Sequence, residues 1–380
     1  MSHPERGSGE KITAAIVGTG GIAEAHVTAI RELGEHMELV AAVDVDEERL
    51  RVFCEQHGIR GRYTDLDRML AQEGPRLVHI CTPPSSHAPL SIRSLRAGAW
   101  VFCEKPPCTT LAELDEIEVA EDETGRYCSF VFQWRFGSGA KHLRRLIETE
   151  AFGRPLLTIC HTAWFRDHGY YEVPWRGRWE TEAGGPTVGH GIHATDLVLW
   201  LLGDWTEVRS MIGRVDREIE TEDVSMAMVE FESGARGSFV TSVVSPREET
   251  YLRFDFQQAT VELRHLYGYT DADWRFTPRP GEQEAALGDT WARTPAALPS
   301  THTSQLRAIV DSMREGGRPP TGPREVRPTM EFIAALYRSA MTGVPVARAS
   351  LTREDPFYHA LHGNLAGWAP REPERSQAAG

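Results

Sequence analysis

The chain has no long hydrophobic run. Hydrophobic residues make up 41 % of its 380 residues, yet no stretch approaches the roughly 20 consecutive apolar residues of a membrane span. The first ten residues are polar and lack the apolar core of a signal peptide. These absences predict a globular protein that works in the cytoplasm and has no membrane partner.

Positive charge and cysteine are also scarce. Lysine and arginine number 41 against 55 aspartates and glutamates, which gives a net charge of −14. A field of this sign repels nucleic acid and anionic lipid, so we expect neither as a partner. The six cysteines include no CxxC pair. Buried, reduced thiols are therefore expected in place of a disulfide framework.

The first third of the chain alternates short apolar runs with amphipathic stretches. The runs are Ile12–Val17, Leu39–Val43, Leu77–Cys81, Trp100–Cys103 and Tyr127–Phe132. Helical patterns lie between them, at Ile22–Leu33, Glu47–His57, Ser86–Ala97 and Leu111–Glu123. This alternation is typical of a mostly parallel, doubly wound α/β sheet. It predicts a nucleotide-binding Rossmann domain over residues 11–133.

The pattern changes after Gly137 and predicts a second, α+β domain over residues 134–368. The strands expected there are Thr158–Phe165, Val224–Phe231, Gly237–Val244, Tyr251–Phe256 and Thr260–Leu263, the last four as two hairpins. The expected helices are Ser138–Glu150, Thr303–Arg314 and Pro328–Thr342, and Tyr267–Pro299 is expected to be a long loop with one strand. Residues 1–10 and 369–380 are expected to be flexible tails.

A glycine-rich turn joins the first apolar run to the first helical pattern. It reads Gly18-Thr19-Gly20-Gly21-Ile22-Ala23, which is the GxGxxG/A spacing of dinucleotide-binding turns. Asp44 follows the second run, where a carboxylate accepts from ribose hydroxyls and repels a 2′-phosphate. We therefore predict NAD as the cofactor, with NADP less favoured. The alternative is a plain turn in which Asp44 only caps the next helix.

Lys105 follows the buried run Trp100–Cys103, between Glu104 and Pro106. Ligands of open α/β sheets bind outside the carboxyl ends of the strands, so a lysine at this position is a candidate for chemistry. The alternative is an exposed loop lysine.

Several motifs, in this order, resemble the Gfo/Idh/MocA oxidoreductases, the family of glucose–fructose oxidoreductase and myo-inositol dehydrogenase. They are the glycine turn with His26 in the next helix, Thr82-Pro83 with His87, Ala97-Gly98, Glu104-Lys105-Pro106, Phe132-Gln133-Trp134-Arg135-Phe136, Trp175-Arg176, Gly184-Gly185, Gly191–Asp196 and Asp355–Tyr358. The resemblance covers nearly the whole chain. It implies a Rossmann domain followed by a domain with a large, open, mostly antiparallel sheet, and a nicotinamide cofactor with a sugar, cyclitol or polyol substrate.

The resemblance also implies roles for individual residues. Lys105 and His193 match the catalytic lysine and histidine. Besides the glycine turn and Asp44, the residues that match cofactor-binding positions are Thr82, Pro83, His87, Glu104, Lys105 and Gln133. Trp175 and Arg176 are the preferred substrate-binding candidates because the family also has Trp-Arg there, and Arg135, His190 and His193 are further candidates. No metal is implied, although the spacing of His190, His193 and Asp196 allows that alternative.

The chemistry of alcohol oxidation suits this pair. We expect His193 to take the hydroxyl proton while Lys105 polarises the oxygen, and the reverse division remains open. One position departs from the family pattern. An aspartate often stands four residues before the histidine, but this chain has Gly189 there. His190 is one candidate to compensate.

Two other functions remain open. The first is a glycosidase that uses bound NAD for transient oxidation, and the second is a non-enzymatic NAD-sensing regulator. An open antiparallel sheet would also expose an apolar face. We therefore predict a homodimer or homotetramer formed through the second domain.

Overall fold

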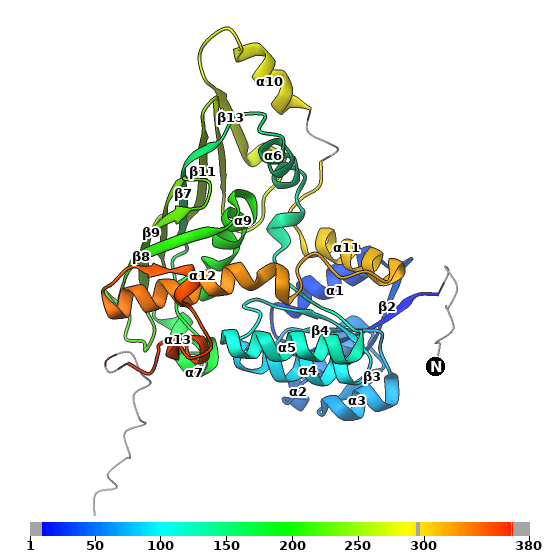
Figure 1. Ribbon diagram of the computed structural model, residues 1–380. Coiled ribbons are helices and arrows are strands. Elements are labelled where there is room, and N and C mark those ends of the chain that lie inside the picture. Colours follow the sequence, from blue (N-terminus) through cyan, green and yellow to red (C-terminus); the bar gives the residue numbers. More distant parts are fainter. Residues whose placement is uncertain (1–9, 294–296, 366, 368–380) are drawn as a thin grey trace, which may run out of the picture.

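The computed structural model describes residues 10–293, 297–365 and 367. It has two sheets, one in each half of the chain (Figure 1). Apart from Glu10, the tails predicted at 1–10 and 369–380 lie outside the described residues. No helix in the described part is long and apolar enough to cross a membrane.

The first sheet has six parallel strands in the order β3-β2-β1-β4-β5-β6. The strands are β1 Ile12–Val17, β2 Met37–Val43, β3 Gly61–Tyr63, β4 Leu77–Ile80, β5 Trp100–Cys103 and β6 Cys128–Phe130. The helices are α1 Ala23–Glu32, α2 Glu47–His57, α3 Leu66–Glu73, α4 His87–Arg96 and α5 Leu111–Thr124. The strand order reverses between β1 and β4, which is where doubly wound sheets bind their ligands.

The predicted Rossmann fold is confirmed, and the sequence missed only β3 and α3. The five apolar runs form β1, β2, β4, β5 and β6, because strands covered by helices on both faces are apolar throughout. β3 has no such run. Its three residues Gly61, Arg62 and Tyr63 lie at the sheet edge and only Gly61 is buried.

The second sheet has eight strands in the order β13-β12-β11-β7-β10-β9-β8-β14. The strands are β7 Pro155–Ala163, β8 Trp205–Gly213, β9 Val224–Phe231, β10 Arg236–Ser242, β11 Glu249–Phe256, β12 Ala259–His265, β13 Trp274–Pro278 and β14 Val346–Ala347. All neighbours are antiparallel except β7 and β10. The predicted open, mostly antiparallel sheet and both hairpins are therefore confirmed.

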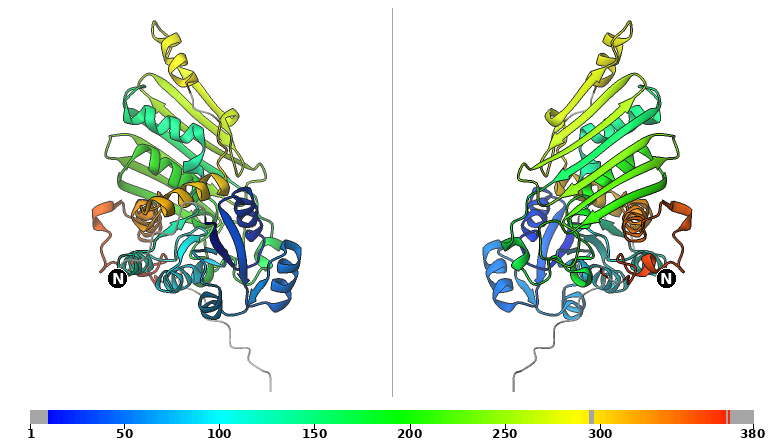
Figure 2. Two further views of the ribbon diagram at one scale, coloured as in Figure 1. Left: turned by 90° about the vertical axis from the view of Figure 1, so that its right-hand side faces the viewer. Right: turned by 90° about the vertical axis from the view of Figure 1, so that its left-hand side faces the viewer.

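The remaining helices cover one face of this sheet and connect it to the first domain. They are α6 Ser138–Glu148, α7 Trp179–Glu182, α8 Pro186–Gly189, α9 Ile192–Leu202, α10 Glu284–Ala292, α11 His302–Glu315, α12 Pro323–Thr342 and α13 Pro356–His359. Helix α10 was not expected, since Tyr267–Pro299 was predicted to be a loop with one strand. Helices α6 and α9 lie over one face, while the opposite face is open (Figure 2).

Helix α11 returns to the first domain late in the chain, beside α1 (Figure 1). Its side chains Leu306, Ile309 and Val310 belong to the core formed with β1 and α1. Gln305 accepts a hydrogen bond from the backbone N–H of Phe132 and donates to the Phe130 carbonyl at 2.6 Å. A segment predicted as part of the second domain thus completes the core of the first.

A buried ion pair holds together the residues at the start of the second domain. Arg135 lies in the short 3₁₀ segment Gln133–Phe136 and binds both carboxylate oxygens of Asp196 on α9, with Nε–Oδ2 at 2.7 Å. It also donates to the Glu325 carbonyl on α12. Asp196 accepts a further bond from Thr329. Three separate segments therefore meet at one charge pair.

We expect Arg135→Ala to lower the free energy of unfolding by about 3–5 kcal/mol, because it leaves the Asp196 carboxylate buried without its partner. Urea unfolding followed by fluorescence measures this. Arg96→Ala, which removes the exposed pair with Glu123, is the matched control and should cost below about 1 kcal/mol. Equal costs for both variants would contradict the assigned role of the buried pair.

Candidate active site

The glycine turn has the geometry of an anion cradle. Gly18 has φ +88°, and a Cβ there would lie 2.8 Å from the Cys81 carbonyl oxygen, so only glycine lets the turn contact the end of β4. Gly20 and Gly21 are exposed, with nothing within 4 Å of an added Cβ. No side chain caps the start of α1 after Ile22. Open backbone and a free helix N-terminus fit the pyrophosphate of a dinucleotide.

Asp44 ends β2 beside this turn. It accepts hydrogen bonds from the backbone N–H and hydroxyl of Thr19, both at 2.7 Å, and from the backbone N–H of Asp46. Arg49 folds back from α2 and binds both carboxylate oxygens, at 2.6 and 3.0 Å. Although burial opposes ionisation, these donors lower the pKa of Asp44 to about 2. Arg49 thus already binds the carboxylate that the sequence assigns to the cofactor.

His87 braces two loops at the edge of the site. Its ring nitrogens lie 2.8 Å from the Thr82 carbonyl oxygen and 2.7 Å from that of Pro106. The ring is fully buried, while Thr82 and Pro83 are partly exposed. Thr82 and Pro83 thus remain free to contact a ligand. The position of His87 suits it to hold the Thr-Pro loop against the Glu-Lys-Pro turn.

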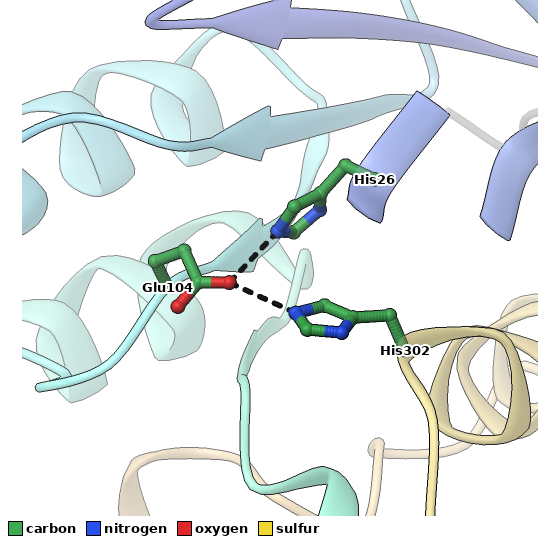
Figure 3. A group of neighbouring side chains, drawn as sticks. All are labelled: His26, Glu104 and His302. Atoms are coloured by element: carbon green, nitrogen blue, oxygen red, sulfur yellow. Dashed lines mark hydrogen bonds and ion pairs between the residues drawn. The ribbon is translucent and has the colours of Figure 1, made fainter. Parts of the chain in front are cut away.

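Glu104 is the centre of a buried polar cluster (Figure 3). Its Oε1 atom lies 3.0 Å from Nε2 of His26 on α1 and 3.0 Å from Nε2 of His302 at the start of α11. Nδ1 of His26 lies 2.9 Å from Nδ1 of His79 on β4. Burial opposes the charge, but the two histidines keep the pKa of Glu104 well below its usual range.

The hydrogen bonds define the protons of this cluster. Glu104 is ionised and can only accept, so His26 and His302 donate from Nε2. Burial lowers the pKa values of His26 and His79, so both rings are neutral at pH 7. Nδ1 of His26 is then an acceptor, and His79 donates to it. Among the described residues, His26, Glu104 and His302 are the only three placed to share a metal ion, and hydrogen bonds already account for their geometry.

Lys105 extends from this cluster toward the second domain. Its backbone N–H donates to Oε2 of Glu104 at 3.2 Å, and its Nζ donates to the carbonyl oxygen of Gly189 at 2.7 Å. The side chain is half-buried. Burial lowers the pKa of Lys105 from 10.5, with Arg176 and Arg166 acting in the same direction and Glu104 and Glu182 opposing it.

His193 lies at the start of α9, close enough to Lys105 to be affected by its charge. Its ring stacks on Trp134 at 5.4 Å and meets the edge of Tyr267 at 5.7 Å. Neither ring nitrogen has a hydrogen-bond partner among the described residues. Burial, followed by the charge of Lys105, holds the pKa of His193 well below 6.5, so the ring is neutral at pH 7. Gln133 is also buried here.

Aromatic rings and arginine lie on the other side of Lys105. Arg176 is placed between Trp175 and Tyr170, with its guanidinium carbon 4.2 Å and 3.9 Å from the two ring centres. The ring of His190 lies 5.5 Å from Trp164, and burial holds its pKa well below 6.5. The ring of Tyr170 also lies 6.0 Å from that of His190.

The structure contradicts two of the predictions made from the sequence. The guanidinium of Arg135 is used inside the fold by Asp196 and the Glu325 carbonyl, so we do not retain Arg135 as a substrate-binding candidate. The same pair occupies both oxygens of Asp196, which removes the metal alternative with His190 and His193.

Sequence reasoning missed three residues of the site, namely Arg49, Glu182 and His302. None belongs to a motif. His302 comes from a helix far along the chain, and Glu182 lies in the one-turn helix α7. Only the acid-rich stretch before Gly184-Gly185 hinted at Glu182.

The neutral buried histidines predict a pH-dependent stability. Burial lowers the pKa values of His26, His79, His190 and His193. Below about pH 6.5 the unfolded chain therefore binds protons that the folded chain does not. We expect the free energy of unfolding to fall as the pH drops below 6.5, by up to about 1.4 kcal/mol per pH unit for each such histidine.

Urea unfolding at several pH values measures the slope. His79→Phe should reduce this slope by the contribution of about one bound proton, whatever its effect on absolute stability. His168→Gln, at an exposed position, should leave the slope unchanged. A slope unaffected by His79→Phe would mean that His79 is not neutral in the folded protein.

Comparison with known proteins identifies the family of the chain. Residues 12–132 match the model of the oxidoreductase family with an NAD-binding Rossmann fold, and residues 140–264 match the GFO/IDH/MocA C-terminal domain. D-apiose dehydrogenase of Paraburkholderia graminis is 29 % identical over 365 residues, covering 91 % of this chain and 92 % of that protein. D-glucoside 3-dehydrogenase of Escherichia coli K12 is 25 % identical over 357 residues, covering 87 % and 96 %.

A solved structure extends the similarity to the whole fold. The WlbA dehydrogenase from Chromobacterium violaceum, in complex with NADH and UDP-GlcNAcA, matches with a TM-score of 0.79 and 27 % identity, covering 91 % of this chain and 99 % of that chain. The two family models together span more than half of the 380 residues. The chain therefore belongs to the GFO/IDH/MocA family of NAD-binding oxidoreductases.

Proposed function

We propose that this oxidoreductase is an NAD-dependent dehydrogenase of a secondary alcohol in a sugar, cyclitol or related polyol. The observation that carries the proposal is the meeting of Lys105 and His193 at the carboxyl end of β5, beside the open glycine turn. The relatives are named as dehydrogenases of apiose and glucosides. These names favour oxidoreduction over the glycosidase and the regulator.

Oxidation of the alcohol needs a hydride acceptor, a proton acceptor and a group that holds the oxygen. NAD⁺ supplies the hydride acceptor when it is bound. Gly18, Gly20, Gly21, Ile22 and Ala23 would hold its pyrophosphate and Asp44 its adenosine ribose, with Thr82, Pro83, Glu104 and Gln133 completing the site. Arg49 must share Asp44 with the ribose. The ionised carboxylate of Asp44 repels a 2′-phosphate, which favours NAD over NADP.

Lys105 is the better proton acceptor of the two candidates. A general base works best with a pKa near the operating pH. Burial moves the pKa of Lys105 from 10.5 toward neutrality, whereas it moves that of His193 away from neutrality. We therefore assign the hydroxyl proton to the neutral amine of Lys105. His193, neutral and without a protein partner, donates a hydrogen bond that orients the same oxygen. This is the reverse of the division first expected from the sequence.

The substrate would bind between His193 and the aromatic side chains. Trp175 presents an apolar face suited to the C–H surface of a sugar ring, and Arg176 and His190 carry donors for its hydroxyl groups.

A cytoplasmic location agrees with the six cysteines, which are all free and buried.

The direct test is a dehydrogenase screen with NAD⁺ and NADP⁺ against sugars, inositols and sugar acids, followed by NADH absorbance. The proposal expects net NADH formation with at least one polyol and a preference for NAD⁺. Product formation without net NADH would favour the glycosidase. A strong preference for NADP⁺ would overturn the role given to Asp44.

With a substrate from this screen, Lys105→Ala and His193→Ala should each lower kcat/KM by about 10²–10⁴. NADH binding, followed by fluorescence, should stay within a few-fold of the unchanged protein, because both residues act on the substrate oxygen. Lys141→Ala on α6 is the matched control. Full activity of Lys105→Ala would refute the proposed chemistry.

We also propose that the protein is a homodimer or homotetramer that covers the open face of the second sheet. Met226 and Met228 on β9 and Met211 on β8 point to this face and are 52 %, 66 % and 73 % exposed. Met226 lies directly opposite Met211. Such an apolar face is more stable when a second copy covers it.

Analytical ultracentrifugation at micromolar concentration should give a dimer or tetramer. Met226→Glu combined with Met228→Glu should shift it toward monomer, because the interface would then bury charges. Val119→Glu, also at an exposed apolar position but on α5, should leave the mass unchanged. A monomeric wild-type protein would refute this proposal.

A further inference from the structure

Gly189 leaves space beside Lys105. Its carbonyl oxygen accepts a 2.7 Å hydrogen bond from Lys105 Nζ. A Cβ added at Gly189 would have one neighbour within 4 Å, Oε1 of Glu182 at 3.7 Å. The backbone of Gly189 does not have a positive φ, so it does not require a glycine. A carboxylate from another element thus lies next to the site that a side chain at position 189 would fill.

Glu182 is held firmly in this place. It is buried at the end of α7. Its Oε2 accepts the backbone N–H of Gly177 at 2.6 Å, and its Oε1 lies 3.3 Å from Arg176. Burial raises the pKa of Glu182, whereas the bond from Gly177 and the charges of Arg176 and Lys105 lower it.

The charged and titratable groups that act on Lys105 come from several elements. They are Glu104 beside it, Glu182 on α7, Arg166 and Arg176, and the histidines His87, His190 and His193. Only two of these groups are anions. Glu104 is already bonded to His26 and His302. Glu104 has the larger effect on Lys105, and Glu182 is the carboxylate that lies beside Gly189, whose carbonyl oxygen binds Lys105 Nζ.

We propose that Glu182 is a positioning residue whose negative charge, opposite Lys105, sets the pH at which the lysine can accept the substrate proton. The proposal rests on the role given to Lys105 in the proposed function. The carboxylate stabilises the ammonium form and so opposes the loss of charge caused by burial. Without it, the neutral amine would prevail at lower pH, and Lys105 would lose its charged neighbour beside Gly189.

The first test measures Lys105 in the protein without cofactor or substrate. The chain contains only three lysines, at positions 11, 105 and 141, so the pH dependence of acetylation by acetic anhydride, read by peptide mass spectrometry, gives the pKa of each. Glu182→Gln should lower that of Lys105 by about one unit or more and leave Lys141 unchanged. Glu180→Gln, exposed on the same helix, should change neither.

The second test moves the carboxylate. In the Glu182→Gln background, Gly189→Asp should return the pKa of Lys105 toward its wild-type value. The rising limb of the plot of kcat/KM against pH, which reports the loss of the Lys105 proton, should return with it. Gly189→Asp alone places two carboxylates together and should shift that limb to higher pH. Thermal unfolding and NADH binding confirm that each variant is folded.

The outcomes separate the two proposals. An unchanged pKa of Lys105 in folded Glu182→Gln overturns the role of Glu182, whether or not the enzyme oxidises polyols. A shifted pKa combined with full activity of Lys105→Ala supports the charge pairing but overturns the proposed function on which its catalytic meaning depends. Failure of Gly189→Asp to restore the limb also counts against Glu182, since it would show that Glu182 acts through packing and not through charge.

Discussion

The site depends on one buried hydrogen-bonded charge, the carboxylate of Glu104 between His26 and His302. An ionised carboxylate loses several kcal/mol of hydration on burial, so it persists only where donors replace the water. Here the donors are two imidazoles, His26 on α1 and His302 on α11. The same carboxylate fixes the backbone of Lys105 and joins the C-terminal half of the chain to the first domain.

The reactive groups are arranged around this charge. Lys105 starts at Glu104 and ends on the Gly189 carbonyl, so its Nζ is held between the two domains. His193 lies nearby on α9. Its ring remains neutral because burial and the charge of Lys105 both lower its pKa. The carboxylates of Glu104 and Glu182 both stabilise the charged form of Lys105. Proton affinity at this position is set by a balance of burial, two anions and two arginines.

Much of this arrangement followed from the sequence, for identifiable reasons. Continuous apolar runs predicted five strands of the first sheet, and alternating patterns predicted the strands of two hairpins in the second. The glycine turn, Glu104-Lys105 and His193 belong to motifs. Arg49, Glu182 and His302 do not, because their roles arise from long-range contacts that spacing does not encode. Arg135 shows the opposite error, since a motif residue was assigned to the substrate although Asp196 holds it inside the fold.

Neutron diffraction from crystals of the protein at pH 7 would test the central cluster most directly, because it locates the hydrogens. The account predicts a single proton on His26, at Nε2, a proton on Nε2 of His302, a single proton on His79, at Nδ1, and none on Glu104. A proton on Glu104, or a doubly protonated His26, would contradict the account.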